Sequence, residues 1–389
     1  MIKSNLPLAV SSWDDKEIDA MQKVIDSQQF SMGEKVKEFE ASFSRYLNCK
    51  HAVMVNSGSS ANLLMIASLF YTKKPFLKPG DEVIVPAISW STTYFPLHQY
   101  GLKIKFVDID KHTLNLDIEK LKQAITSSTK LIMAVNLLGN PNHFDEIKSL
   151  IKNKEIQLIE DNCESLGSKY KNQFSGTFGL CGSFSTFFSH HISTMEGGIV
   201  ATNNDEIYHI LISLRAHGWT RNLPKNNLIT GTKSEDAFEE SFKFVLPGYN
   251  LRPIELSGAI GIEQVKKLDQ FIETRRKNAL HFKSIMDDNP FFMIQSEIGK
   301  SSWFGFSLIV KQDSGVDRKD LIDFLSEKLI EYRPIVSGSF VKQPVIKYLN
   351  VDLTQDLSNS DYVHKNGLFI GNHHFDIRSK LDIIKSFKK

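Results

Sequence analysis

The segment most informative about the fold class is Ile156-Gln157-Leu158-Ile159-Glu160-Asp161-Asn162-Cys163-Glu164. Its apolar run predicts a buried β-strand, and the acidic residues that follow mark the carboxyl end of that strand. In α/β folds, ligands bind outside the carboxyl ends of parallel strands. A solvated turn at the end of a strand has the same composition, so this segment alone leaves both interpretations open.

Short β-rich runs alternate with helical patterns on both sides of this segment. The predicted strands are 52–55, 82–86, 104–109, 131–135, 156–160, 182–187 and 198–202. The predicted helices between them include 60–69, 117–125 and 144–151. Buried strands that alternate with helices are typical of an α/β fold with a mainly parallel sheet covered on both faces.

Two helices are predicted before the first of these strands. The first begins at Ser12-Trp13-Asp14-Asp15, a helix-start pattern that apolar residues at helical spacing follow. The second runs from about Lys35, and its predicted inward face consists of Val36, Phe39, Phe43 and Leu47.

The pattern changes after Pro253 and indicates a second domain. The elements expected there are a long helix to about Met286, a strand at 303–310 and helices at 318–329 and 379–387. We therefore expect a large domain over residues 1–252, which includes the N-terminal helices, and a smaller α+β domain over residues 253–389.

A polar segment at residues 221–244 separates the last predicted strand of the large domain from this second domain. Connections of that length without secondary structure are uncommon unless they have a function. We therefore expect an ordered loop near the active site.

Composition excludes several classes of protein. The chain has 389 residues, and its 47 basic and 45 acidic residues give a net charge of +2, so no overall attraction to nucleic acid or anionic membranes is expected. The cysteines Cys49, Cys163 and Cys181 are too few and too scattered for a disulfide framework, which favours a reducing compartment. No signal peptide or membrane-spanning run is recognisable. We expect a cytoplasmic protein.

Two further segments carry candidate chemistry. The turn Asn56-Ser57-Gly58-Ser59-Ser60-Ala61-Asn62 precedes an apolar helix, where free backbone N–H groups can face a phosphate, although the same residues are ordinary helix caps. Residues 183–198, SFSTFFSHHISTMEGG, contain the adjacent His190 and His191. We expect these two side chains to lie on a strand and point to opposite faces, and no Cys/His cluster with metal spacing surrounds them. No metal site is predicted.

In this order and spacing, the three segments resemble the nucleotide-sugar aminotransferase family of fold-type I PLP-dependent enzymes. That family has an S-G-[ST]-x-A phosphate turn, a strand-end E-D-x-x-[QE], and an S-F-x-x-x-[TS]-K-x-x-x-x-x-E-G-G segment. A fourth match is the family's G-x-N-x-R stretch, here Gly248-Tyr249-Asn250-Leu251-Arg252. The resemblance implies a fold-type I PLP-dependent transferase with a mainly parallel sheet in its large domain and a smaller C-terminal domain.

The chain departs from the family pattern at His190, where the resemblance places the lysine that forms a Schiff base with PLP. No lysine between Lys171 and Lys225 could replace it. An imidazole cannot form that covalent bond, but it can transfer protons near neutral pH. A histidine here is similar to the small group of PMP-dependent sugar 3-dehydratases. Long runs such as 216–224 and 241–250 extend that resemblance over essentially the whole chain.

This resemblance implies removal of the C3 hydroxyl from a nucleotide-linked 4-keto-6-deoxy sugar, GDP-linked and of the manno configuration, in dideoxysugar (colitose) biosynthesis. The implied cofactor is PMP, which L-glutamate regenerates from PLP, with release of ammonia and without an iron–sulfur cluster. The resemblance also implies a homodimer, and it gives His190 the role of proton-transfer group.

The resemblance further assigns roles at the cofactor. Asp161 would pair with the pyridinium nitrogen and keep the ring an electron sink. Trp90 would stack on the ring, and Glu164, which replaces a more usual Gln, would contact the ring hydroxyl or the amine. The residues expected to hold the phosphate are Gly58, Ser59 and Ser185, with Asn250 reaching it from a neighbouring subunit.

Four residues are candidates for substrate binding. His217 and Phe242 are expected to line the sugar pocket, Arg221 to reach into a partner's site, and Arg333 to meet a carboxylate or phosphate. For an Arg or His in a sequence, a surface ion pair or a core role is an equally good interpretation.

Three alternatives remain. An ordinary PLP-dependent sugar aminotransferase is opposed by the absent lysine. The iron–sulfur branch of the 3-dehydratases needs a cysteine set that three scattered cysteines do not supply. A non-catalytic PLP-fold regulatory protein is disfavoured by the retention of Asp161, Ser185 and Glu164.

Overall fold

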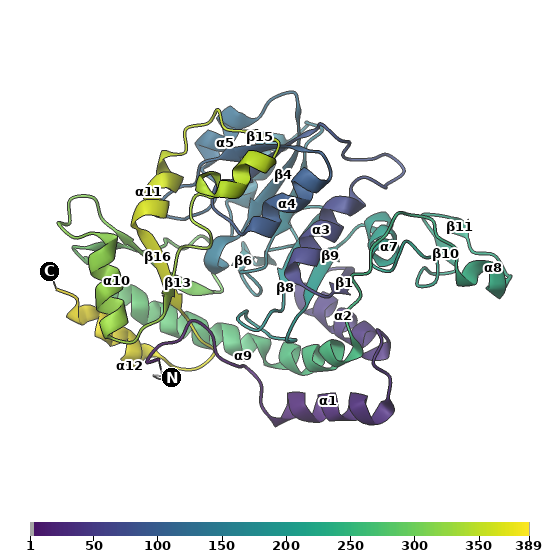
Figure 1. The fold of residues 1–389 in the computed structure, drawn as a ribbon, viewed down its shortest axis with the longest axis horizontal. Helices are drawn as coiled ribbons and strands as arrows, with labels where there is room; N and C mark the ends of the chain where they lie inside the picture. The colour runs from purple at the N-terminus through teal and green to yellow at the C-terminus, as the bar shows by residue number, and fades with distance from the viewer. Residues whose placement is uncertain (1–3, 389) are drawn as a thin grey trace.

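An eight-stranded sheet forms the centre of the computed structural model, which describes residues 4–388 (Figure 1). Its strands are β1 (His51–Val55), β2 (Glu82–Pro86), β3 (Lys103–Val107), β4 (Thr129–Val135), β5 (Gln157–Asp161), β8 (Cys181–Ser185), β9 (Gly198–Thr202) and β15 (Val351–Asp352). They lie in the order β1-β9-β8-β5-β4-β2-β3-β15. Strand β9 is antiparallel to β1 and β8, and the other neighbours are parallel. The prediction of a mainly parallel α/β sheet is confirmed.

Helices cover both faces of this sheet (Figure 1). Those on one face are α3 (Gly58–Ser68), α4 (Ser91–Gln99) and α7 (Asp205–Leu214); those on the other include α5 (Ile118–Ala124) and α6 (Phe144–Ile151). Strand geometry explains the two layers, because successive side chains point to opposite faces. Val53 and Val55 of β1 pack with the first set of helices, whereas Ala52 and Met54 pack on the opposite side.

Three helices line the lower edge of the molecule in Figure 1: α1 (Asp15–Ser27), α2 (Glu34–Leu47) and the long α9 (Glu255–Met286). Asp14 caps α1 as predicted, in a capping box with Glu17. The predicted inward face of α2 is also confirmed, since Val36, Phe39, Phe43 and Leu47 are at most 2% exposed. Gly261 of α9 allows close packing on α2, because a Cβ there would lie 2.7 Å from the Phe39 ring.

A smaller unit follows α9 and contains a four-stranded sheet in the order β12-β13-β16-β14. Its strands are β12 (Phe292–Met293), β13 (Gly305–Val310), β14 (Tyr332–Arg333) and β16 (Gly367–Gly371). Its helices are α10 (Arg318–Glu327), α11 (Ser358–Asn366) and α12 (Arg378–Leu381), with 3₁₀ turns at Phe340–Lys342, Pro344–Tyr348 and Asp382–Ser386. The helix predicted at 379–387 is thus a short α-helix continued by a 3₁₀ turn.

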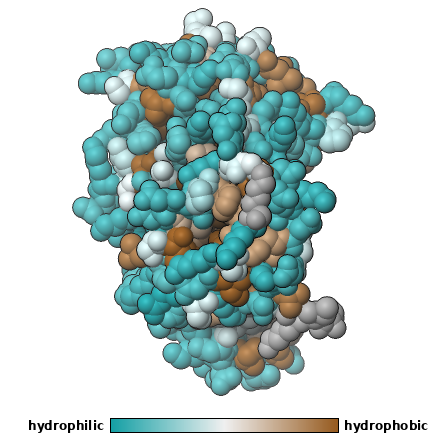
Figure 2. All heavy atoms as spheres, turned by 90° about the vertical axis from the view of Figure 1, so that its left-hand side faces the viewer, coloured by the Kyte–Doolittle hydropathy of each residue, from teal (hydrophilic) through white to brown (hydrophobic). Residues whose placement is uncertain are grey.

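The chain crosses between the two units near each end. Leu6 pairs with Ile330 and is buried in the core of the smaller unit, so the N-terminal arm leaves the large unit. Near the other end, β15 follows strands of the smaller unit in the chain but adds an edge strand to the large sheet, beside β3. The domain boundary at residues 252 and 253 stays a prediction. Figure 2 shows the face that carries the smaller unit, where hydrophobic side chains gather in a band across a largely hydrophilic surface.

The segment at 221–244 is ordered, but it projects from the side of the large unit opposite the smaller one (Figure 1). It contains β10 (Asn226–Asn227), β11 (Gly231–Thr232) and α8 (Ala237–Ser241). A second small hairpin consists of β6 (Lys169–Tyr170) and β7 (Gln173–Phe174), and a 3₁₀ turn lies at Leu137–Gly139. Within residues 4–388, no helix has both the length and the apolar composition of a membrane span.

Candidate active site

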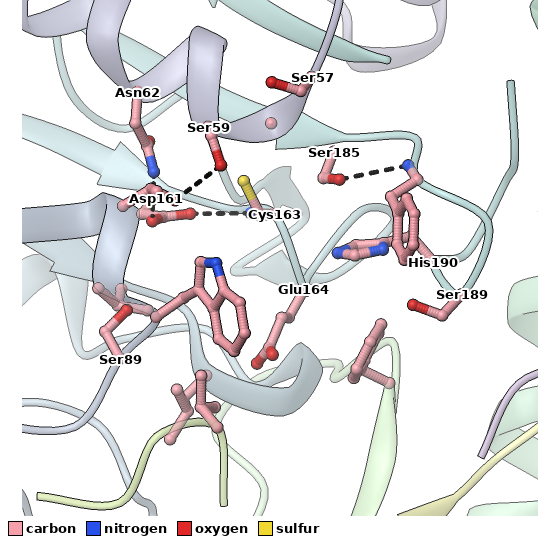
Figure 3. A pocket seen from close by; sticks show the side chains of 18 of the residues that line it. Ser57, Ser59, Asn62, Ser89, Asp161, Cys163, Glu164, Ser185, Ser189 and His190 are labelled. Atoms are coloured by element: carbon pink, nitrogen blue, oxygen red, sulfur yellow. Dashed lines mark hydrogen bonds between the residues drawn. The ribbon is translucent and has the colours of Figure 1, made fainter. Parts of the chain in front are cut away.

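A cavity of about 330 Å³ lies at the carboxyl ends of β4, β5 and β8, where the large sheet meets the smaller unit (Figure 3). Its walls come from the starts of α3 and α4, the segment after β5 and the loop between β8 and β9. The smaller unit contributes Phe304, Arg333, Val336 and Phe369, and the N-terminal arm contributes Leu8 and Ala9. The predicted location of the site at the strand ends agrees with this geometry.

Asp161 lies in the floor of the cavity at the end of β5 and is only 5% exposed. Its Oδ2 accepts a hydrogen bond from Asn62 Nδ2 at 2.8 Å, and its Oδ1 accepts one from the backbone N–H of Cys163 at 3.2 Å (Figure 3). Thr93 Oγ1 also donates to Oδ2, at 2.8 Å. These three donors fix the orientation of the carboxylate. The carboxylate can therefore pair with a cationic N–H that enters the cavity.

The phosphate turn forms the N-terminus of α3. Ser57 caps this helix through a hydrogen bond from Ser60 N–H to its Oγ at 3.1 Å. Gly58 packs directly on Ser185, and a Cβ at Gly58 would lie 2.6 Å from the Cβ of Ser185. Ser59 also lines the cavity. A helix N-terminus with small hydroxyl-bearing residues around it favours the binding of an anion such as phosphate.

His190 and His191 lie in a turn after β8, so the prediction that they lie on a strand is wrong. The ladder between β8 and β9 ends at the pair Ser185–Gly198, and the chain then folds back so that His190 N–H donates to the carbonyl of Phe187 at 2.9 Å. The two rings still have different surroundings. His190 lines the cavity, whereas His191 is buried and its Nε2 is 3.2 Å from the carbonyl of Ser302.

The cavity shifts the pKa values of two titratable groups in opposite directions. Burial, assisted by the positive charge of Arg275, lowers the pKa of His190 to about 4, so the imidazole is neutral at pH 7 and can accept a proton. Burial raises the pKa of Glu164 to about 7, and the charge of Asp161 adds to that rise. The hydrogen bond from Leu138 N–H to Glu164 Oε2, at 3.0 Å, opposes the rise.

Most of the cofactor-site predictions converge on this one cavity. The predicted residues that line it are Gly58, Ser59, Trp90, Asp161, Glu164, Ser185, His190 and Arg333. Trp90 lines the cavity and is 57% exposed. Sequence reasoning missed Asn62 and Thr93, which hold Asp161, and Phe304, which packs its ring 5.2 Å from that of His190. Asn62 lies within the quoted phosphate turn, but nothing local in the sequence links Phe304 to the site.

The other four predicted residues lie outside the cavity of their own chain. His217, Arg221 and Phe242 surround Trp219, with the guanidinium of Arg221 4.7 Å from the indole ring. Asn250 is exposed, and its Oδ1 accepts a hydrogen bond from Arg252 Nε at 2.9 Å. Their assignment to a cofactor or substrate stays a prediction. The segment 221–244 does not line this cavity either.

Within residues 4–388, no three His, Cys, Asp or Glu side chains are grouped as a metal site would require. Cys49, Cys163 and Cys181 are free thiols, and of these Cys163 lines the cavity. Burial raises the pKa of the Cys163 thiol well above its ordinary value, which keeps it protonated.

Comparison with known protein families identifies the family of this chain. A model of the DegT/DnrJ/EryC1/StrS aminotransferase family matches residues 11–378. The chain belongs to this family. The family and fold expected from the sequence are thereby confirmed.

Members of this family include close relatives of the chain. GDP-4-keto-6-deoxy-D-mannose 3-dehydratase of Escherichia coli O55:H7 is 60% identical over 386 residues, which cover 99% of this chain and 100% of that protein. Two solved structures of GDP-4-keto-6-deoxymannose-3-dehydratase are similar to the chain with a TM-score of 0.97 and 60% identity, covering 98% of this chain and 99% of theirs. One is a histidine-to-asparagine mutant with bound GDP-perosamine, and the other holds a trapped PLP–glutamate geminal diamine.

The residues of the cavity fit a pyridoxal or pyridoxamine phosphate. Gly58 leaves space beside Ser185 that a Cβ would fill, at the N-terminus of a helix. Asp161 presents a fixed carboxylate, and the Nδ1 atom of His190 is buried without a hydrogen-bond partner. An anion site, a partner for a pyridinium and a free imidazole nitrogen are the three features that such a cofactor requires. None of the lysines in the described part of the chain lines the cavity.

Proposed function

We propose that the chain is a PMP-dependent 3-dehydratase that converts GDP-4-keto-6-deoxy-D-mannose to GDP-4-keto-3,6-dideoxy-D-mannose, with L-glutamate as the amino donor. The observation that carries the proposal is the position of His190 in the wall of a cavity that no lysine of residues 4–388 lines. The 60% identity to enzymes of that name supports the same substrate.

The chain's own residues divide into binding and proton-transfer groups. When bound, PMP supplies an amine that reacts with the C4 ketone of the sugar and a ring that withdraws electrons. Asp161 would hold the ring nitrogen, Trp90 would cover the ring, and Glu164 would contact the ring hydroxyl or the amine. Ser59, Ser185 and the backbone at Gly58 would hold the phosphate.

His190 would move the protons. Its side chain has no hydrogen-bond partner within residues 4–388, so its ring nitrogens are free to accept and donate. We assign to it the removal of a proton from the cofactor's C4′ carbon and the delivery of a proton to the departing C3 hydroxyl. A neutral imidazole can do the first, and the imidazolium formed can do the second.

The overall reaction balances with glutamate as the only co-substrate. The sugar loses one oxygen atom at C3, glutamate is oxidised to 2-oxoglutarate, and the amino nitrogen leaves as ammonia. An ordinary sugar aminotransferase would instead retain that nitrogen in the sugar. This difference separates the proposed function from its main alternative.

A mass-spectrometric assay tests the proposal. The purified protein, loaded with PMP and supplied with glutamate, is incubated with a panel of nucleotide-linked 4-keto-6-deoxy sugars. We expect a product from the GDP-linked manno substrate that is lighter by one oxygen atom, with ammonia and 2-oxoglutarate formed in equal amounts. An amino-sugar product, or turnover only of a dTDP- or UDP-linked sugar, would overturn it.

The composite site is part of the proposal. We infer a homodimer in which Asn250 reaches the phosphate, and Arg221 the sugar, of the partner subunit. His217 and Phe242 would line the sugar pocket there, and Arg333 would bind an anionic group of glutamate or the nucleotide. Asn250, Arg221 and Phe242 are exposed and lie outside their own chain's cavity, which supports this arrangement.

A further inference from the structure

Arg275 is a buried guanidinium behind the wall of the cavity. It lies on α9, is 4% exposed, and donates from Nη1 to the carbonyls of Phe304, at 3.2 Å, and Asn372, at 2.7 Å. Its Nε has no hydrogen-bond partner, and no carboxylate in residues 4–388 pairs with it. A buried charge without a counter-ion is strongly unfavourable, so a position that retains one calls for a functional explanation.

Phe304 connects this guanidinium to the active site. Its backbone carbonyl accepts the hydrogen bond from Arg275, while its ring lines the cavity. The ring centroid lies 5.2 Å from that of His190 and 5.8 Å from that of His191. Asn372 also joins α9 to the segment that carries Phe304, because its Nδ2 donates to the carbonyls of Arg275, at 3.1 Å, and Trp303, at 2.9 Å.

Several charged or titratable groups surround His190, and one of them shifts its pKa. The groups that face it or share its cavity are His191, Arg275, Asp161, Cys163, Glu164, Glu196 and Arg333. Of these, Arg275 is the one whose charge acts on the pKa of His190, after burial itself. Its own pKa is lowered by burial to about 10, so it stays positive at neutral pH. Its charge, after burial, also lowers the pKa values of His373 and His374.

We propose that Arg275 is a positioning residue for proton transfer by His190: it holds Phe304 against the imidazole and places a fixed positive charge behind it. The proposal rests on the proposed role of His190. A nearby positive charge destabilises the imidazolium. His190 is then neutral when it must accept a proton, and it releases that proton readily to a leaving hydroxyl.

An NMR titration of the PMP-loaded protein, without sugar, tests this proposal. Histidine is labelled with ¹³C at the ring, and the His190 signal is assigned by its absence in His190→Asn. In the wild type we expect His190 to titrate well below the ordinary histidine pKa. Arg275→Met should raise that pKa by about one pH unit or more, and Arg275→Lys, which keeps the charge, should leave it low. The acid limb of the kcat/KM profile should move by the same amount.

Arg276→Met is the matched control. Arg276 is the next residue of α9, and it also clamps backbone carbonyls, those of Ser301 at 2.9 Å and Gly167 at 3.1 Å. Its charge does not act on His190. We therefore expect Arg276→Met to leave the His190 titration unchanged, even if it lowers stability as much as Arg275→Met.

Two results overturn the proposal: a wild-type His190 with an ordinary or raised pKa, or equal shifts in Arg275→Met and Arg276→Met. Should Arg275→Met fail to fold, Arg275→Gln replaces it, because its amide can still donate to the two carbonyls. The titration uses no nucleotide sugar. A failure of the substrate assay therefore leaves this test standing, and the converse also holds.

Discussion

His190 and His191 are adjacent in the chain but differ in what they can do. His190 lines the cavity and its Nδ1 has no hydrogen-bond partner among residues 4–388, whereas His191 is buried outside the cavity with its Nε2 3.2 Å from the carbonyl of Ser302. The Nδ1 of His191 also lacks a partner among the described residues, so access to the cavity is what separates a proton-transfer role from a structural one. This contrast makes the pair a direct test of the site.

His190→Asn should preserve the fold and cofactor binding, since Asn is polar and of similar size. It should lower kcat by at least about 100-fold, because an amide cannot accept a proton near neutral pH. The rate of 2-oxoglutarate formation and the absorbance of bound cofactor measure the two effects. Near-normal turnover would show that another group carries the proton.

His191→Asn is the control for that substitution. It should keep kcat within a few-fold of the wild type, because the ring does not reach the cavity. It should lower the free energy of unfolding by about 1–3 kcal/mol, as buried polar groups lose a partner. Urea unfolding and turnover, measured on the same preparation, separate the roles. A variant of normal stability with no activity would reverse the assignment.

Glu164 makes stability depend on pH in the cofactor-free protein. Its pKa is about 7 in the folded chain and near its ordinary value of 4.5 when unfolded. Between these two values the folded state binds the extra proton, so this group's contribution to stability falls as pH rises towards 7 and is constant above it. The full change is about 3 kcal/mol at most.

Glu164→Gln isolates that contribution, since the amide does not titrate. We expect the free energy of unfolding of the variant to rise relative to the wild type as pH increases from 4.5 to 7. The depressed pKa values of His190 and His191 act in both proteins and cancel in the difference. A difference that is flat across this range, measured by urea unfolding, would falsify the raised pKa.

At the scale of secondary-structure elements, the start of α3 is the feature that forms the phosphate site. Gly58→Ala should weaken cofactor binding by about tenfold or more, because the new Cβ lies 2.6 Å from the Cβ of Ser185 and forces the helix end away. Equilibrium dialysis with PMP measures the loss.

Gly33→Ala is the matched control for Gly58→Ala. Gly33 precedes α2 and does not line the cavity, and a Cβ there would lie 3.1 Å from the side chain of Glu255. We expect cofactor affinity to stay at the wild-type value. Equal losses in the two variants would mean that Gly58 affects folding in general and not the phosphate site.

At the scale of the whole molecule, the homodimer is a prediction, and the projecting segment at residues 221–244 exposes aromatic side chains that a partner subunit could cover. Phe238 is 87% exposed and Phe242 is 65% exposed on the projecting segment. Exposed apolar groups of this kind mark contact surfaces. We expect a homodimer by light scattering, with active sites that draw residues from both subunits.

Subunit complementation tests the composite site. His190→Asn and Asn250→Ala should each be inactive alone. When they are mixed in equal amounts and allowed to exchange subunits, half of the dimers are mixed and each has one intact site, so about a quarter of wild-type activity should return. A fully active monomer, or no recovery after verified exchange, contradicts the arrangement.

The sequence by itself determined the strand and helix order, the inward face of α2 and most of the cofactor cavity. The order of elements and the inward face of α2 follow from apolar periodicity, and the acids after β5 and the small residues before α3 mark two parts of the cavity. Trp90, Ser185 and His190 were assigned through the family resemblance. The missing lysine at His190 was equally visible, because a motif of fixed spacing defines where it belongs. None of these inferences depends on contacts between distant segments.

Only the tertiary structure decided the features that depend on such contacts. It placed His190 and His191 in a turn, because pairing between β8 and β9 stops at Ser185 and Gly198. It brought Phe304 and Arg275 to the histidine from segments about a hundred residues later in the chain. It also showed that the N-terminal arm pairs with the smaller unit at Ile330 and that β15 joins the sheet of the large unit beside β3. Long-range packing and burial set these positions and the pKa values that follow from them, and no local pattern in the sequence encodes them.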